Sequence, residues 1–434
     1  MKKYIILPFS SDLNRGDQAL VWNTIKFAKE AGHNGDYFVL SSSGESLSQS
    51  EGLGIKTLHS ILQHPGRKSK LSNKDYKFFL KFSWGVIAIM DLIKSKLLIN
   101  RLTRFFGKML LSKNEMETYN IIKNSEACFV KGGGFLHSAG KLTGSYTIYY
   151  SLYHIRLAQS FKKPIYILPN SFGPFNGIFV RGMIKKTLKK CEVIMSRENI
   201  SHQMLNQINI KNYLCPDLGF YLQKSKNNSD EINKIKGLYP KHKLVGITVR
   251  PYRFPFSKKP NLKYDEYKAS IVFLCHWLFK NGYLPVFVNH TLSTRSHESD
   301  MRAIIEITSK LGEGLYYVVS NDNFDCRDLK EVYSCFDYVI GTRFHSVIFA
   351  LSEKVPSIAI TYGGNKGEGI MVDMGLANYF IPIEKVFSES LILKFKLLIE
   401  NEEYILGKLN DYDAVLEKEY NSIIRLLKDG VING

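Results

Sequence analysis

The sequence predicts an α/β protein with two Rossmann-like domains that face a cleft. Short β-branched and aromatic runs alternate with longer segments of helical period along most of the chain. The alternation restarts after a polar, basic stretch that begins near residue 226. The length of 434 residues exceeds what a single core of roughly 100–200 residues needs. In open parallel sheets, ligands bind beyond the carboxyl ends of the strands.

The first domain is predicted to span residues 1–225 and the second to span residues 244–385, with a linker at 226–243. The expected strands of the first domain are the apolar runs at 4–7, 37–40, 127–130, 165–168, 193–196 and 213–215. Those of the second domain are the runs at 244–249, 285–289, 315–319, 338–340 and 357–360. Residues 386–434 are predicted to form two C-terminal helices.

The charge of the chain is strongly positive, with 59 Lys and Arg against 40 Asp and Glu, a net +19. Ten of these charges come from one stretch, from Arg67 to Lys113, where basic residues are interleaved with bulky apolar ones. We interpret it as a basic amphipathic helical insertion at about residues 66–115. It either lies on an anionic membrane surface or packs its apolar face on its own domain. Nucleic acid is the least favoured partner, because no known binding module accompanies the patch.

Cysteine usage and hydropathy predict a cytoplasmic protein, with attachment to the inner face of the plasma membrane as an alternative. The six cysteines show neither a C-x-x-C pair nor metal-ligand spacing, which is typical of reduced thiols. The apolar run at the N-terminus is too short for a signal peptide, and no stretch approaches the ~18 apolar residues of a membrane span. The histidines form no zinc motif, so we expect no metal.

Two groups of candidate residues follow strands of the first domain. After the first strand, Gly16 allows close approach of a ligand, and Asn14 and Asp17 can hydrogen-bond it, although Asp17 could equally serve the start of a helix. Three glycines follow the strand at 127–130, among them Gly133 and Gly134, and their N–H groups could receive an anion at a following helix.

Two further groups follow later strands. Arg197 comes directly after the strand at 193–196 and could bind a carboxylate or phosphate, or form a salt bridge with its neighbours. Arg343 and His345 follow the strand at 338–340 and are expected at a helix N-terminus, whose dipole favours anions. This last group is the most specific of the four, and Lys366 lies beyond the next strand.

Taken in order, these segments resemble the polysaccharide pyruvyl transferase family. The resembling pieces run from Asn14-Arg15-Gly16-Asp17 through Gly132-Gly133-Gly134, Leu168-Pro169-Asn170-Ser171, Ser196-Arg197-Glu198, Pro216-Asp217 and Gly341-Thr342-Arg343-Phe344-His345 to Tyr362-Gly363-Gly364-Asn365-Lys366. Phe344 stands where the family usually has Leu, and the last piece is one residue longer than the family's Tyr-Asp-Pro-Lys. The resemblance implies a GT-B-like architecture.

The resemblance also implies a reaction, the transfer of pyruvate from phosphoenolpyruvate to two sugar hydroxyls as a cyclic ketal, with release of phosphate. The acceptor would be a sugar of an exopolysaccharide, a capsule or a lipid-linked glycan, and phosphoenolpyruvate would be a co-substrate rather than a cofactor. Carried onto this chain, Arg197, Arg343 and Lys366 bind the donor, and Asn170 belongs to the substrate site. His345 is the candidate proton donor, and Asp17 the candidate acceptor of a hydroxyl proton.

Two other functions remain open at this point. One is a metal-independent GT-B-type glycosyltransferase in which Arg343 and His345 hold the diphosphate of a nucleotide sugar. The other is a non-catalytic, membrane-associated scaffold of glycan assembly that keeps only the fold and uses the basic segment.

Overall fold

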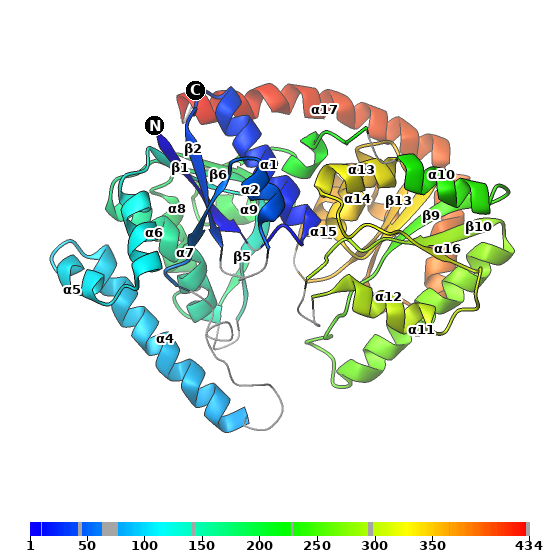
Figure 1. The fold of residues 1–434 in the computed structure, drawn as a ribbon, viewed down its shortest axis with the longest axis horizontal. Coiled ribbons are helices and arrows are strands. Elements are labelled where there is room, and N and C mark those ends of the chain that lie inside the picture. The colour runs from blue at the N-terminus through cyan, green and yellow to red at the C-terminus, as the bar shows by residue number, and fades with distance from the viewer. Residues whose placement is uncertain are drawn as a thin grey trace. The chain divides into compact units, whose positions relative to one another are not determined.

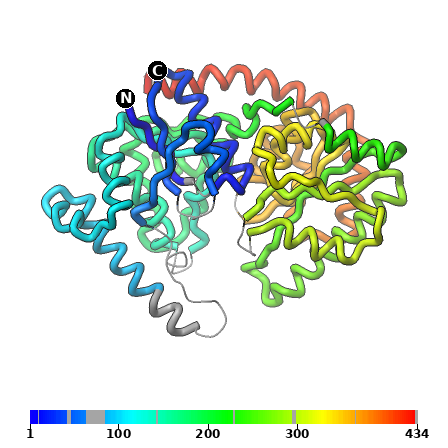
Figure 2. Tube along the Cα trace, viewed as in Figure 1, coloured from blue at the N-terminus to red at the C-terminus, as the bar shows by residue number. Residues whose placement is uncertain are grey.

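The computed structural model describes residues 1–9, 11–41, 46–62, 77–140, 144–226, 229–293, 298–363 and 365–430. By their contacts, the residues divide into two compact units. Unit 1 consists of Met1–Ser11, Thr24–Cys215 and Ser422–Gly434, and unit 2 of Asp12–Asn23 and Pro216–Asn421. Figure 1 shows that each unit has a central sheet flanked by helices, and Figure 2 traces the chain through both. The segment Asp12–Asn23 groups with unit 2, although the sequence places it in the range of the first domain.

The sheet of unit 1 is parallel in every described strand pair, in the order β3-β2-β1-β4-β6-β7-β8, with β5 paired to β6. Its strands are β1 (Lys3–Phe9), β2 (Asp36–Ser41), β3 (Lys56–His59), β4 (Ala127–Val130), β5 (Gly133–Ala139), β6 (Ile165–Asn176), β7 (Val193–Ser196) and β8 (Tyr213–Leu214). Its helices are α2 (Ser48–Gly52), α4 (Lys77–Ile99), α5 (Arg104–Met109), α6 (Lys113–Lys123), α7 (Gly144–Ser160), α8 (Val180–Leu188) and α9 (Asn199–Asn206). Helix α1 (Arg15–Glu30) starts in unit 2 and ends in unit 1.

The sheet of unit 2 is also parallel, in the order β11-β10-β9-β12-β13-β14. Its strands are β9 (Lys243–Thr248), β10 (Tyr283–Phe287), β11 (Tyr317–Val318), β12 (Tyr338–Gly341), β13 (Ser357–Thr361) and β14 (Phe380–Pro382). Its helices are α10 (Ser229–Leu238), α11 (Pro260–Lys280), α12 (Asp300–Thr308), α13 (Cys326–Ser334), α14 (Phe344–Leu351), α15 (Lys366–Asp373), α16 (Ser388–Glu400) and α17 (Glu402–Asp429). The last residues of α17, from Ser422, group with unit 1. Short 3-10 turns form η1 (Leu218–Tyr221), η2 (Ala377–Tyr379) and η3 (Ile383–Lys385).

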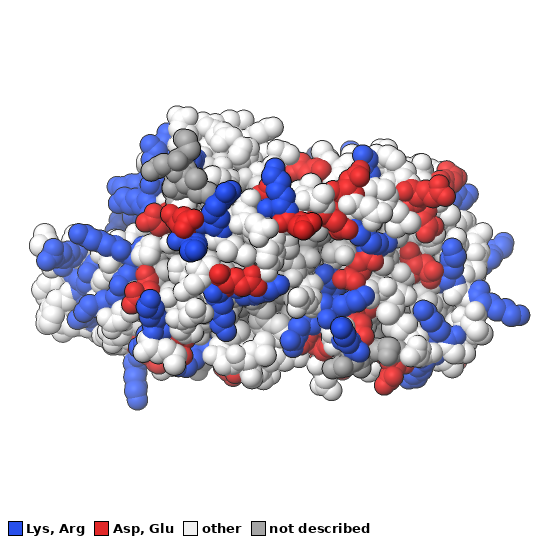
Figure 3. All heavy atoms as spheres, turned by 90° about the horizontal axis from the view of Figure 1, so that it is seen from above, with Lys and Arg blue, Asp and Glu red and all other residues white. Residues whose placement is uncertain are grey.

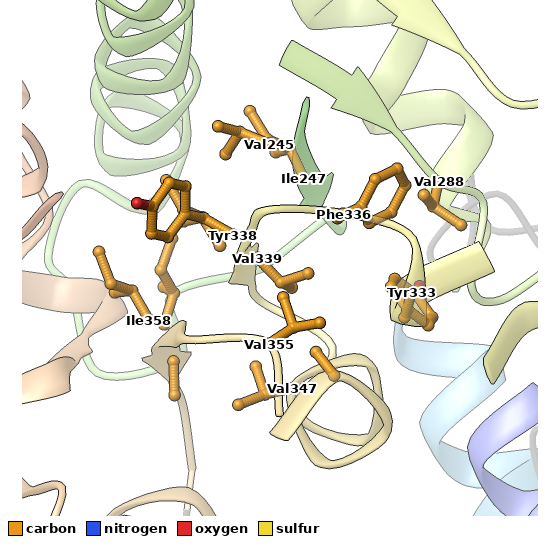
Figure 4. Packing of buried hydrophobic residues seen from close by; sticks show 14 of the residues in the cluster. Val245, Ile247, Val288, Tyr333, Phe336, Tyr338, Val339, Val347, Val355 and Ile358 are labelled. Carbon is orange, nitrogen blue, oxygen red and sulfur yellow. The ribbon is translucent and has the colours of Figure 1, made fainter. Parts of the chain in front are cut away.

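Each unit has its own apolar core, as the continuous apolar strands require, because a parallel sheet buries both of its faces. In unit 2, Ile247 of β9, Val339 of β12 and Ile358 of β13 are fully buried. Val347 of α14 packs into the same cluster (Figure 4). This packing holds the start of α14 against the ends of the strands, where the candidate residues lie.

The helical insertion and the C-terminal helices form as predicted in the part of the chain that the structure describes. Helices α4 and α5 and the start of α6 occupy the predicted insertion, whose residues Arg67, Lys68, Lys70 and Lys74 lie outside the described residues. Helices α16 and α17 close the chain. None of the described helices has both the length and the apolar character that crossing a membrane requires.

Two local predictions are wrong. The expected linker at 226–243 contains α10, whose Ile232 and Ile235 are buried in the core of unit 2, because its apolar residues recur at helical spacing. The glycines at 132–134 do not precede a helix directly. Gly133 and Gly134 open strand β5, which pairs with β6, and the next helix, α7, begins at Gly144.

Candidate functional site

The carboxyl edge of the sheet in unit 2 gathers three of the predicted residues. Arg343 follows β12, His345 lies in the first turn of α14, and Lys366 is the first residue of α15 after β13. Because β12 and β13 are parallel neighbours, the segments that follow them leave the sheet at the same edge. Gly364, part of the predicted Tyr362–Lys366 piece, lies outside the described residues.

Arg343 is held by a buried carboxylate that sequence reasoning missed. Its Nη2 and Nε atoms lie 2.6 and 2.8 Å from the same Oδ1 of Asp300, and Nη2 also donates to the Glu298 carbonyl at 2.6 Å. The other Asp300 oxygen accepts the Thr291 amide at 2.9 Å. Burial is the largest single influence and would lower the pKa of Arg343, but Asp300, Tyr362 and Glu298 together outweigh it, and the pKa lies above the ordinary value. Arg343 therefore stays charged and rigidly oriented at the edge of the sheet.

The imidazole of His345 is packed between two glycines of unit 2. A Cβ on Gly16 would lie 2.2 Å from Nδ1 of His345, and one on Gly219 would lie 3.5 Å from its Cδ2. Position 16 therefore has to be glycine, as long as α1 begins where it does. Nε2 of His345 lies 3.9 Å from Oδ1 of the fully buried Asp217. That oxygen also accepts the Gly219 amide at 2.7 Å, which fixes the carboxylate beside the ring.

Asn14 and Asp17 build the start of α1. The Asn14 Oδ1 atom accepts the Asp17 amide at 3.3 Å, and its Nδ2 donates to the Asp17 carboxylate at 3.4 Å. Asn14 also forms an isolated antiparallel bridge with Thr291, beyond β10. The cap of α1 is therefore Asn14, and Asp17, considered as a capping residue in the sequence, lies in the first turn instead. This cap anchors the Gly16 backbone against His345.

Arg250, Tyr362 and His290 are further polar groups that follow strands at this edge. The Arg250 guanidinium stacks 4.3 Å from the centre of the Tyr362 ring. Burial works to raise the pKa of Tyr362, but Arg250 and Arg343 outweigh it and lower the pKa below the ordinary value. Burial, together with the Arg343 and Arg15 charges, lowers the pKa of His290 well below its usual range. His290 is therefore a neutral imidazole, which bonds Tyr333 at 3.1 Å through Nδ1.

Arg197 forms a second, separate site in unit 1 with Gly134 and Asn170. Arg197 directly follows β7, and its Nε donates to Ser171 Oγ at 2.8 Å, while the Glu198 carboxylate lies 3.7 Å away. A Cβ on Gly134 would come within 3.3 Å of Arg197 Nη2, so the glycine strand leaves room for the guanidinium. This geometry agrees with the alternative of a salt bridge to a neighbouring residue, and the binding of a carboxylate or phosphate by Arg197 stays a prediction.

Asn170 and Gly133 lie on the adjacent strands β6 and β5, directly opposite each other. Asn170 is fully buried, and its Nδ2 donates to the carbonyls of Lys131 and Leu168 at 2.8 and 2.9 Å. The Arg197 amide donates to the Asn170 carbonyl at 3.1 Å. Asn170 thus ties the middle of β6 to the residues that directly follow β4 and β7. The predicted convergence of Arg197 with Arg343, His345 and Lys366 stays a prediction, because Arg197 belongs to unit 1 and the others to unit 2.

Some of the missed residues carried a signal and others did not. Arg250 follows a predicted strand, as Arg343 does, and the same rule could have found it. Asp300 starts α12, well after β10, and nothing in the sequence pairs it with Arg343. In the described ranges, the His, Cys, Asp and Glu side chains form no group of three or more that could hold a metal ion. The six cysteines are free thiols.

The chemistry of the site agrees with the sequence match. The family model for polysaccharide pyruvyl transferase matches residues 14–364. The chain belongs to this family. A relative, the amylovoran biosynthesis protein AmsJ of Erwinia amylovora, is 24% identical over 307 residues, which are 69% of this chain and 72% of AmsJ. The chain is therefore a transferase of polysaccharide biosynthesis.

Solved structures confirm the fold class of this pyruvyl transferase family member. MnaA of S. aureus, determined with UDP, aligns with a TM-score of 0.59 at 10% identity, covering 99% of this chain and 96% of that one. A glycosyltransferase of Rickettsia africae aligns with a TM-score of 0.51 at 14% identity, over the whole of both chains. At these identities the likeness concerns the fold alone, which is the predicted GT-B-like arrangement of two Rossmann-like domains.

Proposed function

We propose that the protein transfers pyruvate from phosphoenolpyruvate to two hydroxyls of one sugar as a cyclic ketal, with release of phosphate. The acceptor is a sugar of a surface glycan, such as an exopolysaccharide or capsule, or of its lipid-linked precursor. The observation that carries the proposal is the cationic edge of the sheet in unit 2, where Arg250, Arg343 and Lys366 follow the strands beside His345. A relative named for amylovoran biosynthesis supports a polysaccharide as the acceptor.

The donor carries a carboxylate and a phosphate, and both require cations or oriented N–H groups. Arg343, kept charged by its neighbours and held in place by Asp300, fixes the position of a guanidinium at this edge. The N-terminus of α14 adds its dipole at the same place. Lys366, whose Nζ lies 5.8 Å from the centre of the Phe344 ring, is a point charge suited to a departing phosphate. Arg343, Lys366 and the N-terminus of α14 can therefore stabilise the negative charge of the bound donor and, later, that of the departing phosphate.

The reaction starts with protonation of the methylene carbon of phosphoenolpyruvate, which converts the methylene to a methyl group. His345, as imidazolium, is the proposed donor of this proton. The neighbouring carbon becomes oxocarbenium-like, and the first sugar oxygen bonds to it and loses its proton. The carbon–oxygen bond to phosphate then breaks, the phosphate leaves with its electron pair, and the second hydroxyl attacks. One hydroxyl proton restores the imidazolium, and the other is carried away by phosphate.

Two carboxylates can assist the sugar. Asp17 is the acceptor proposed from the family resemblance, and its place in the first turn of α1 is fixed by Asn14. Asp217 lies 3.9 Å from His345 Nε2 and can orient the imidazole for proton transfer. We propose that no metal and no organic cofactor takes part, and that the reaction occurs in the cytoplasm.

The test uses the full chain with phosphoenolpyruvate and a panel of purified surface glycans and lipid-linked precursors. We expect phosphate release that depends on the acceptor, and an acceptor that gains a pyruvate ketal by mass spectrometry. In deuterated water, the methyl group of the ketal should carry one deuterium, because the methylene carbon takes its proton from an exchangeable site. Chelation with EDTA should leave the rate unchanged.

The matched variants are His345→Gln in the site and His276→Gln on the exposed face of α11. We expect His345→Gln to lower kcat by about 100-fold or more, and His276→Gln to match the parent. Binding of UDP-sugars, together with no phosphate release from phosphoenolpyruvate in the presence of any acceptor, would overturn the proposal in favour of a nucleotide-sugar enzyme. A second outcome would favour a non-catalytic scaffold: full modification of the glycan in cells whose only copy of the protein is the His345→Gln variant, and likewise in cells with only the Arg343→Ala variant.

A further inference from the structure

Helices α4 and α5 of unit 1 present an apolar surface to solvent. Nine large apolar side chains between residues 86 and 110 are more than 40% exposed. They are Val86, Ile89, Met90, Ile93, Leu102, Phe105, Phe106, Met109 and Leu110. Figure 1 shows α4 extending from the other helices of unit 1. Several large exposed apolar side chains on neighbouring helices are typical of a surface that binds a membrane or another protein.

The orientation of α4 is set by contacts on its other side. Lys94 is buried, and its Nζ lies 2.7 Å from Glu115 Oε1 of α6 and 3.3 Å from the Ile61 carbonyl. Ser95 Oγ bonds the Tyr149 hydroxyl of α7 at 2.7 Å, and Leu98 is fully buried. On the same side, Leu92 and Ile99 are partly buried against the core of unit 1 that contains Leu98. The helix therefore packs on its own domain through polar and apolar residues, and its remaining apolar residues face outward.

The charge around the apolar surface is positive. From residue 84 to residue 110, the described chain has one carboxylate, Asp91, and it is only 4% exposed. Lys96 and Arg101 are exposed between the apolar residues of α4 and those that lead into α5. In Figure 3, Lys and Arg mix with Asp and Glu over most of the face, whereas the left tip shows Lys and Arg among uncharged atoms.

The surface continues onto the turn before α8. Ile178 and Phe179 are 70% and 79% exposed. Phe179 has a φ of 63°, a left-handed conformation that costs a bulky residue free energy. A pocket of about 770 Å³ is lined by Phe179 together with Lys96 of α4 and Arg156 of α7. An aromatic ring and two cationic side chains thus line the same pocket beside α4.

We propose that this surface, residues 86–110 with Ile178 and Phe179, docks the protein on an anionic lipid bilayer. The apolar side chains enter the boundary between headgroups and acyl chains, and Lys96 and Arg101 bind lipid phosphates. Charge complementarity selects the bilayer over a second copy of this chain, because two copies of a cationic patch repel each other. The proposal does not depend on the transferase reaction.

The test measures flotation of the full chain with vesicles of phosphatidylcholine alone and with added phosphatidylglycerol. We expect binding to the anionic vesicles that weakens in high salt. Replacing both Lys96 and Arg101 by Gln should lower the partition coefficient roughly 30-fold, at about fivefold for each charge. The triple variant Phe105→Ser, Phe106→Ser, Met109→Ser should remove binding at any salt concentration.

A matched control replaces two exposed apolar residues of unit 2, Phe273→Ser with Leu393→Ser, and should bind as the parent does. Circular dichroism and the Tm show that each variant is folded, and transfer to a water-soluble acceptor separates lipid docking from activity. Failure of the parent to bind anionic vesicles overturns the proposal. So does equal binding by parent and triple variant, or a parent dimer that the triple variant converts to monomers without any vesicle binding.

Discussion

Replacing Gly16 by Ala tests the close approach of α1 to His345. The added methyl group would lie 2.2 Å from Nδ1, 2.6 Å from Cγ and 2.8 Å from Cβ of His345, whereas ordinary contacts start at 3.4 Å. The ring or the first turn of α1 must therefore move by about 1.2 Å, the difference between 3.4 and 2.2 Å. The ring has little room, because Gly219 and Asp217 lie on its other side.

The size of the effect follows from that displacement. A misplacement of about 1 Å at a reacting group costs on the order of 100-fold in rate, or about 2.7 kcal/mol. Overpacking a buried contact also lowers the free energy of unfolding by about 1–3 kcal/mol. An alanine in a helix would otherwise stabilise it by roughly 0.5–1 kcal/mol relative to glycine, so the sign of the change is itself informative.

The assay combines kcat/KM for acceptor-dependent phosphate release with the Tm of the same preparation. Gly237→Ala in α10 is the matched control, because nothing lies within 4 Å of a Cβ there. We expect the control to keep its kcat/KM and to gain slightly in Tm, while Gly16→Ala loses both. Adding His345→Ala removes the 2.2 and 2.6 Å contacts, so the double variant should be more stable than the sum of the single changes.

A Gly16→Ala protein with unchanged kcat/KM and a Tm equal to that of Gly237→Ala would refute the reasoning. It would mean that the contact relaxes at no cost and that the position of the His345 ring does not control the reaction.

Three further predictions concern charge and burial. Asp300→Asn should lower the free energy of unfolding by about 3–5 kcal/mol in urea titrations, because it leaves Arg343 as a buried charge without its partner. The Tyr362 phenol should ionise below its ordinary pKa of 10.0 in absorbance titrations, and Arg250→Met should raise that pKa. Because folding lowers the pKa of Tyr362, ionisation of this phenol stabilises the folded chain. This stabilisation grows as the pH rises through the folded-state pKa and is lost as the pH falls through it. The Cys128 thiol, whose pKa burial raises to about 12, should resist alkylation in the native chain.

Each of these has its own control and its own refuting result. The control Arg302→Ala breaks a more exposed pair with Glu306 and should lower the free energy of unfolding by less than about 1 kcal/mol. If Asp300→Asn lowered the free energy of unfolding no more than this control does, the argument from the buried pair would be contradicted. An unchanged phenol titration in Tyr362→Phe would assign the transition to another tyrosine. Fast alkylation of native Cys128, compared with the urea-unfolded chain, would show that the strand β4 opens.

Strand positions were predictable because a buried parallel strand is a short continuous apolar run. The runs at 127–130 and 193–196 match β4 and β7 residue for residue. Strand β3, Lys56–His59, was missed because all of its residues except Leu58 are polar and its burial is partial. Strand β5 was missed because glycines have low strand propensity, and here they serve a close approach to Arg197.

The site was predictable where its chemistry follows a strand in the sequence, and not where it depends on contacts between distant segments. Arg343 and His345 follow β12 directly, so the strand-end rule finds them. Asp300, 43 positions away, contacts Arg343 only because β10 and β12 both flank β9, which brings their following segments together. The same is true of Gly16. Position 16 requires glycine because the His345 ring lies against it, and the sequence does not show that these two residues are close.

The insertion shows why composition alone could not choose between its two interpretations. Both interpretations assume the same basic and apolar residues, and they differ in which kind faces the domain. The structure contains features of both: Lys94, whose side chain is 11% exposed, pairs with Glu115, and Leu98 one turn further on is fully buried against the domain. Ile93 is 53% exposed, so the membrane interpretation stays a proposal that rests on the outward-facing residues. Arg104 also faces its own domain: it donates hydrogen bonds to the Leu98 and Ile99 carbonyls, and its guanidinium stacks on the Phe161 ring. The positive charge of this segment therefore has two parts, one that fixes the helices to unit 1 and one, at Lys96 and Arg101, that faces outward beside the apolar surface.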